Sequence, residues 1–177
     1  MAKTIVFVHG MFATPLCWER WLPWFEAKGY RCLAPAWPGR DRAVSELRAA
    51  HPDPELGRLT LSAVVARFAA QIASLEQKPI IIGHSFGGLV TQILVGRNAA
   101  AAGIAIHSTP PGGVSTMNWS YWRSNWPMIS PFVDPRAPKA LTFEEFQHAF
   151  ANTLPLEAPR RRAVDTFEGG DAAPEGC

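Results

Sequence analysis

The strongest constraint on the fold of this 177-residue chain is one short segment near its middle. Residues 79–82 read Pro-Ile-Ile-Ile, a β-branched run typical of a buried strand, and an apolar segment of helical character begins near Phe86. Between them, residues 83–87 read Gly-His-Ser-Phe-Gly, so Ser85 stands at the apex of a strand–turn–helix unit. The flanking glycines leave room for a strained turn and for close packing of helix on strand. The serine hydroxyl therefore projects beyond the end of a sheet, where a small molecule can reach it.

Other runs along the chain predict strands that alternate with helices. Residues 4–8 form a continuous β-branched and aromatic run, residues 30–35 read as a second strand, and residues 101–107 read as a fourth. An apolar stripe at helical spacing over 61–75 predicts a helix with Thr60 as its cap. Strands that alternate with helices form right-handed crossovers and a parallel sheet. The sequence therefore predicts an α/β fold with a doubly wound parallel sheet of about four strands.

The connections between these elements carry weaker signals. Thr14 followed by proline is a good helix entry, but Pro23 interrupts the apolar pattern. We therefore expect a turn first and a helix from about Leu22, which ends at Gly29. Residues 42–58 are polar, and we expect a loop there with a helical turn near its start.

The motif G-x-S-x-G between a strand and a helix is the nucleophile elbow, and residues 79–95 resemble the α/β-hydrolase family. The His-Gly pair after the first strand adds to this resemblance. It implies the strand order second, first, third, fourth, with Ser85 as the nucleophile. It also implies an oxyanion hole formed by the backbone N–H groups of Phe86 and Met11, with Phe12 as the alternative to Met11. The family motif residues are His9, Gly10, Gly83, His84 and Gly87.

General rules for parallel sheets point to the same place. Ligands bind at the carboxyl ends of the strands that flank the reversal of strand order, and here those ends carry Gly10 and Ser85. Within the resembled family, epoxide hydrolases and haloalkane dehalogenases use a carboxylate at the elbow, so a serine favours acyl chemistry instead. The resemblance therefore implies carboxylester, lipase-like or thioester hydrolysis, or acyl transfer, on a small, partly apolar ester-like substrate.

The resemblance also divides the chain. It implies a partial hydrolase core over 1–113 and a helical cap segment over 114–159, within which a capping box predicts a helix at 141–150. Residues 160–177 are polar and glycine-rich, and we expect a mostly disordered tail. The last strands of the family fold have no counterpart here, so we expect a chain truncated at its C-terminus.

The catalytic partners of the serine have no clear candidates. In the family an acid and then a histidine base follow the nucleophile along the chain. We expect all the histidines to be structural or solvated: His9, His51, His84, His107 and His148. His107 ends the fourth strand at the correct edge of the sheet, but a strand's width from Ser85. The aspartates do not stand where the family acid belongs: Asp41, Asp134 and Asp165.

Two hypotheses about function therefore stay open. The first is a serine hydrolase that forms an acyl-enzyme on Ser85. The second is a catalytically inactive, hydrolase-like binding protein. Labelling by a fluorophosphonate probe would distinguish a reactive serine from an inert one.

Composition limits the possible partners. The net charge of +2 gives no electrostatic case for nucleic acid, and no apolar run is long enough for a signal peptide or a membrane span. The three cysteines lack metal-binding spacing, and their odd number suits a reducing compartment. We therefore expect a cytoplasmic protein that needs neither a metal ion nor an organic cofactor.

Two further features concern packing. Aromatic residues gather at 18–37 and 119–132, which indicates an aromatic-walled pocket or a packed interface, with plain core filling as the alternative. The fourth strand would leave an apolar edge of the sheet over 103–107, and such edges pair with other chains. We therefore expect self-association through this edge.

Overall fold

The computed structural model describes residues 3–114, 118–129, 132, 134, 137–139, 141–150, 153 and 155. The tail at 160–177, for which the sequence predicts disorder, lies outside the described residues. The chain divides into two compact units. The first consists of Met1–Asp41 and Leu59–Gly112, and the second of Arg42–Arg58 and Gly113–Cys177.

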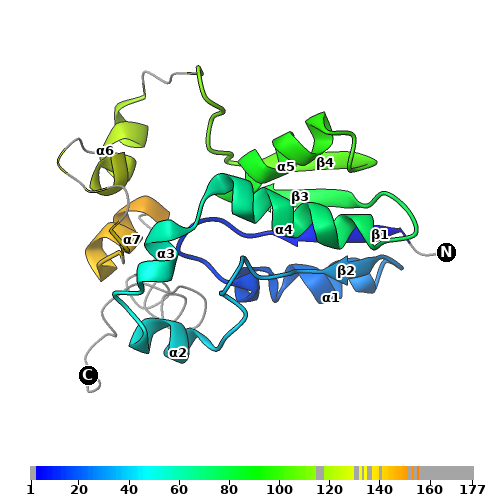
Figure 1. Ribbon diagram of the computed structural model, residues 1–177, viewed down its shortest axis with the longest axis horizontal. Helices are drawn as coiled ribbons and strands as arrows, with labels where there is room; N and C mark the ends of the chain where they lie inside the picture. The colour runs from blue at the N-terminus through cyan, green and yellow to red at the C-terminus, as the bar shows by residue number, and fades with distance from the viewer. Residues whose placement is uncertain are drawn as a thin grey trace. The chain divides into compact units, whose positions relative to one another are not determined.

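The first unit is built around a parallel sheet (Figure 1). Its strands in the described residues are β1 (Thr4–Val8), β2 (Arg31–Leu33), β3 (Ile80–His84) and β4 (Ala102–Ile106). Their spatial order is β2-β1-β3-β4, and all neighbouring pairs are parallel. The predicted fold class and strand order are therefore confirmed. Val8 pairs with Gly83, so β1 and β3 end side by side at one edge of the sheet.

Helices cover both faces of this sheet. They are the 3-10 helix η1 (Pro15–Trp18) and the α-helices α1 (Trp21–Glu26), α4 (Leu61–Ala73) and α5 (Phe86–Gly96). The predicted turn before α1 is η1, and α1 is followed by Gly29 at φ 85°. The predicted cap of α4 is also present, because the Thr60 hydroxyl accepts a hydrogen bond from the Ala63 N–H at 3.2 Å.

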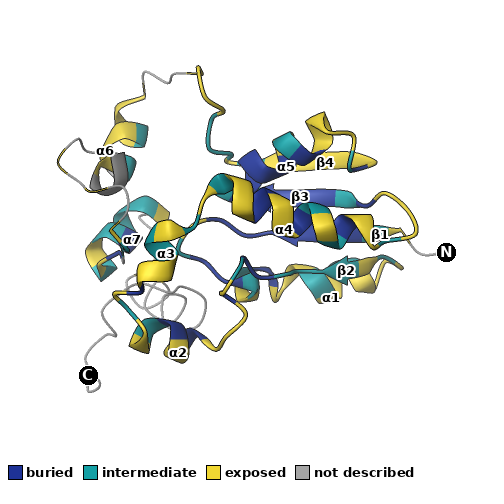
Figure 2. Cartoon of the chain, in the orientation of Figure 1, coloured by how far each residue is buried: buried dark blue, intermediate teal, exposed yellow. Residues whose placement is uncertain are grey.

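The core lies on the two faces of β1 and β3. Alternate residues of a strand point to opposite faces, so Val6 and Val8 pack with α4 and α5, while Ile5 and Phe7 pack with η1 and α1. Figure 2 shows β1 and β3 as the most buried strands and β4 as largely exposed. The centre of the sheet is therefore fixed from both sides at the point where β1 and β3 end.

The described helices of the second unit are α2 (Val44–Ala49), α3 (Pro54–Arg58), α6 (Trp119–Ile129) and α7 (Phe143–Phe150). The sequence correctly predicts α7 and its capping box. The Thr142 hydroxyl accepts from the Glu145 N–H at 3.2 Å, and the Glu145 carboxylate accepts from the Thr142 N–H at 2.9 Å.

The helical turn expected near the start of 42–58 is confirmed as α2, but the rest of the segment is not all loop, because α3 also forms there. Burial of Val44 and Leu47 stabilises α2, and the Asp53 carboxylate accepts a hydrogen bond from the Glu55 N–H at the start of α3. The sequence analysis did not identify α6, whose tryptophan, serine, tyrosine and asparagine residues have modest helix propensity. The burial that stabilises α2 depends on contacts that a local pattern does not contain.

Candidate active site

The turn between β3 and α5 holds Ser85 in an unusual backbone conformation. Its φ is 55° and its ψ is −120°, which few residues other than glycine adopt. Hydrogen bonds between Ser85 and both β4 and the loop after it fix this turn. The Ser85 N–H donates to the Ile106 carbonyl at 3.0 Å, and the Ser85 carbonyl accepts from the Thr109 N–H at 3.0 Å. Both backbone polar groups of the strained serine, its N–H and its carbonyl, are therefore fixed by hydrogen bonds.

The glycines around Ser85 are required by close packing. A Cβ atom on Gly83 would overlap the Gly87 carbonyl, and a Cβ atom on Gly87 would overlap the Val8 carbonyl. The start of α5 therefore rests directly on the ends of β1 and β3, with no room for a side chain between them. This explains in physical terms why the sharp turn carries glycine at both positions.

The loop after β1 passes directly beside the Ser85 side chain. A Cβ atom built on Gly10 would lie 3.0 Å from the Ser85 Cβ and 3.5 Å from the Ser85 Oγ. Phe12, two residues further, has a φ of 64°, which is rare for a bulky residue. Met11 between them is exposed. Met11 and Phe12, the expected neighbours of Ser85, therefore lie on the loop that passes the serine, and the backbone is strained at Phe12.

His9 links this loop to the rest of the site but is not available as a base. Its Nδ1–H donates to the Gly10 carbonyl at 3.0 Å, and its Nε2 accepts from the Trp37 N–H at 3.4 Å. Its ring stacks on Trp37 at 5.1 Å, and Trp37 in turn contacts Phe86. Burial lowers the pKa of His9 to about 4, although the hydrogen bond to Gly10 opposes the shift. The imidazole is therefore neutral, and both of its nitrogens are already engaged.

His84 and His107 lie at the ends of neighbouring strands. Their rings are 6.3 Å apart and nearly perpendicular. Partial burial lowers the pKa of His84, and the charge on His107 lowers it further. In the described part of the chain, no histidine nitrogen is hydrogen-bonded to the Ser85 hydroxyl.

Comparison of the sequence with models of protein families shows which family the chain belongs to. The sequence matches the alpha/beta hydrolase family over residues 5–175. The chain belongs to this family. No curated protein matches the sequence at a significant level.

Solved structures of other α/β hydrolases share its fold. An extracellular alpha/beta-hydrolase from a Paenibacillus species is 18% identical with a TM-score of 0.65, and the match covers 94% of this chain and 67% of that protein. Tomato methylketone synthase I is 14% identical with a TM-score of 0.61, and the match covers 94% and 68%. A pyrethroid hydrolase from Sphingobium faniae is 22% identical with a TM-score of 0.55, and the match covers 76% and 53%.

This α/β hydrolase spans only part of the proteins it matches. For the three solved structures named above, the match covers between 53% and 68% of the other chain. Within the described residues, no helix has both the length and the apolar character needed to cross a membrane. Those residues also contain no group of three or more histidine, cysteine, aspartate or glutamate side chains that could hold a metal ion.

In this hydrolase, residues that no sequence motif marks support the elbow from the β4 side. The Gln92 side chain donates to the Ser108 hydroxyl at 2.7 Å, and that hydroxyl donates to the Thr109 carbonyl at 2.9 Å. A Cβ atom on Gly88 would come within 2.8 Å of the Ser108 side chain. The second glycine of the Gly87-Gly88 pair was the available signal, because a doubled glycine at a helix start indicates close approach of another segment.

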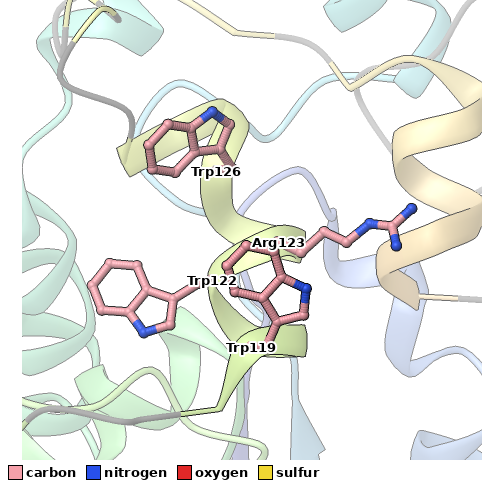
Figure 3. Close-up of a pocket in the computed structure, with 4 residues that line it drawn as sticks. All are labelled: Trp119, Trp122, Arg123 and Trp126. Carbon is pink, nitrogen blue, oxygen red and sulfur yellow. The ribbon is translucent and has the colours of Figure 1, made fainter.

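The two aromatic clusters have different surroundings. In the first unit, Trp18 is buried against Phe7 at 5.1 Å and also contacts Trp21. In the second unit, α6 carries a pocket of about 650 Å³ (Figure 3). The described residues that line it are Trp119, Trp122, Arg123 and Trp126. Core filling therefore accounts for Trp18 and Trp37 of the first cluster, while Trp21 and Trp24 are exposed. A pocket occurs at the second cluster.

Proposed function

We propose that this α/β hydrolase is a serine hydrolase that cleaves carboxylic esters through an acyl-enzyme on Ser85. The strained backbone of Ser85, with its side chain against the loop after β1, is the observation that carries the proposal. A conformation of this kind costs about 1–3 kcal/mol and persists where the surrounding structure enforces it, which is common at reactive sites. The glycines packed on either side of the turn supply that enforcement.

In this mechanism the Ser85 oxygen attacks the ester carbonyl carbon, and the carbonyl oxygen becomes negatively charged in the tetrahedral intermediate. Breaking of the ester C–O bond then leaves an acyl-enzyme and releases the alcohol, which takes the proton lost by the Ser85 hydroxyl, and water hydrolyses the acyl-enzyme to the carboxylic acid and free Ser85. The Phe86 N–H is one proposed donor to that oxygen. Phe86 is the first residue of α5, where a backbone N–H has no partner within the helix and the helix dipole favours negative charge. The second proposed donor is the N–H of Met11, with Phe12 as the alternative. Two such preorganised donors are the usual requirement for acyl transfer.

The proposal assigns no general base among the described residues. The two nitrogens of His9 are engaged with Gly10 and Trp37. The described hydrogen bonds join no histidine to Ser85. This same observation favours the second candidate function, a hydrolase-like binding protein without turnover, because an unassisted serine is a weak nucleophile.

Small, partly apolar esters are the proposed substrates. A pyrethroid hydrolase is among the structures of similar fold, and the serine at the elbow fits acyl chemistry. We keep residues 114–159 as the cap segment of the proposed enzyme.

Active-site labelling with a fluorophosphonate probe tests the nucleophile. The wild-type chain should be labelled on the peptide that contains Ser85, and Ser85→Ala should not be labelled. Ser74→Ala is a matched control, because its hydroxyl bonds only to the Gln71 carbonyl on the exposed end of α4. Labelling that persists in Ser85→Ala would contradict the proposal.

Turnover separates the two candidate functions. An esterase should release 4-nitrophenol continuously from 4-nitrophenyl butyrate, and Ser85→Ala should abolish that release. If the wild-type chain is neither labelled nor active while its circular dichroism shows a folded protein, the binding-protein alternative is favoured.

A further inference from the structure

The helix α6 presents a row of tryptophans that is unusually exposed. Trp119, Trp122 and Trp126 are spaced by three and four residues, so they share one face of the helix. Their exposed fractions are 79%, 41% and 52%. Helices normally bury such an apolar stripe, and large exposed apolar patches mark sites of interaction.

A positive charge stands beside this row. Arg123 lies four residues after Trp119, which makes the two neighbours on the helix surface. In the view of Figure 3, Trp122 and Arg123 extend to opposite sides of α6, with Trp119 between them. The helix itself contains no acidic residue, and among the described residues no carboxylate pairs with Arg123.

The N-terminus of α6 does not compete as the site for an anion. The Asn118 side chain accepts hydrogen bonds from the N–H groups of Ser120 at 2.9 Å and Tyr121 at 3.3 Å. Asn118 therefore caps the first turn. Among the described residues that line the pocket, Arg123 carries the charge.

We propose that this pocket of α6 binds small aromatic carboxylates. Its volume of about 650 Å³ is in the range of small-molecule sites. The indole faces provide flat apolar surface for an aromatic ring, and the guanidinium matches a carboxylate through two parallel hydrogen bonds. The described residues that line the pocket all belong to α6, and none of them has a role in the chemistry proposed for Ser85.

A pair of probes that differ only in charge tests this site on the full chain. 2-Naphthoate carries a carboxylate, and 2-naphthamide has nearly the same shape without the charge. Binding can be followed by the indole N–H resonances in ¹⁵N-correlated spectra, assigned with single Trp→Phe variants. We expect the signals of Trp119, Trp122 and Trp126 to shift on titration with naphthoate, and that of the buried Trp18 to stay in place.

Variants separate the contributions of charge and apolar surface. Wild-type protein should bind naphthoate about tenfold more tightly than naphthamide, because charge-assisted hydrogen bonds are worth that much or more. Arg123→Gln should remove this preference and leave naphthamide binding within about twofold. Trp119→Ala should weaken both probes.

Trp24 provides the matched control. It is an exposed tryptophan of α1 with a cation beside it, since the Lys28 ammonium lies 4.3 Å from the centre of its ring. Trp24→Ala should leave the affinity for both probes unchanged. Equal affinity for the two probes in the wild-type protein would overturn the proposal, as would an unchanged preference in Arg123→Gln. Loss of binding in Trp24→Ala but not in Trp119→Ala would place the site elsewhere and also overturn it.

Discussion

The turn around Ser85 and the tryptophan face of α6 are built in opposite ways. At the turn, glycines abut backbone carbonyls and both nitrogens of His9 are hydrogen-bonded. On α6, three large indoles keep between 41% and 79% of their surface exposed. Attack on a carbonyl needs atoms held within fractions of an ångström, whereas an apolar recognition surface tolerates freedom. The contrast predicts that substitutions at the turn act on stability and substitutions on α6 act on binding.

The largest effect is expected at Gly87. Replacement by alanine would drive a Cβ into the Val8 carbonyl, so α5 must move away from the sheet. We expect Gly87→Ala to cost several kcal/mol or to prevent folding, as measured by urea denaturation. Gly96→Ala in the same helix is the control, because no atom lies within 4 Å of its added Cβ. That change should be neutral or stabilise the protein by up to about 1 kcal/mol. Equal effects of the two substitutions would refute close packing at the turn.

The two aromatic clusters allow the second test. Trp18 is 3% exposed and packs on Phe7 and Trp21, so Trp18→Ala should lower the free energy of unfolding by about 3–5 kcal/mol. Trp119→Ala removes a side chain that is already in solvent and should change it by less than about 0.5 kcal/mol. Thermal and chemical denaturation of both variants provide the measurement. A large loss in Trp119→Ala would mean that the α6 face is a structural contact.

The third test uses pH. Burial lowers the pKa of His9 from 6.5 to about 4, so between these values the unfolded chain takes up a proton that the folded chain does not. Stability should therefore fall as the pH decreases from about 6.5 to 4, by roughly 3 kcal/mol at most. His9→Gln keeps a neutral polar side chain and should flatten that part of the profile. An identical pH dependence in His9→Gln would assign the effect to other groups.

The smallest effect concerns β4, the exposed part of the first unit. Its residues are largely exposed, and in the sheet of the described residues it has a neighbour on one side only. Such edges pair with other chains, so we expect concentration-dependent association. Ile104→Lys should raise the dissociation constant by about tenfold, because lysine on an edge strand disfavours pairing. Analytical ultracentrifugation measures this, with Val114→Lys as an exposed control outside the strand. A wild-type chain that stays monomeric at all concentrations would disprove association.

Local sequence pattern predicts much of the first unit. The β-branched runs at Thr4–Val8 and Ile80–His84 become the central strands, and their order follows from the resemblance to the α/β hydrolases. The capping box at Thr142 also forms as predicted. The capping box depends on residues that are close in sequence. The strands depend on a residue pattern that any buried sheet requires. The helices α3 and α6 escaped prediction, because their residues have modest helix propensity, whereas α2 forms where a helical turn was expected.

The sequence by itself determined the strand–turn–helix unit and the serine at its apex. It did not determine which tryptophans are buried: Trp18 and Trp119 come from equally aromatic segments, and only the first has a sheet face to pack against. It also did not reveal that folding buries His9 against Trp37, which is remote in the chain, so that burial keeps the imidazole neutral despite its hydrogen bond to Gly10. The tertiary structure decided the positive φ of Ser85 as well, because the Ser85 N–H donates to the Ile106 carbonyl and the Ser85 carbonyl accepts from the Thr109 N–H. Burial, strain and pKa depend on groups brought together only by folding, whereas strand and helix patterns are already present along the chain.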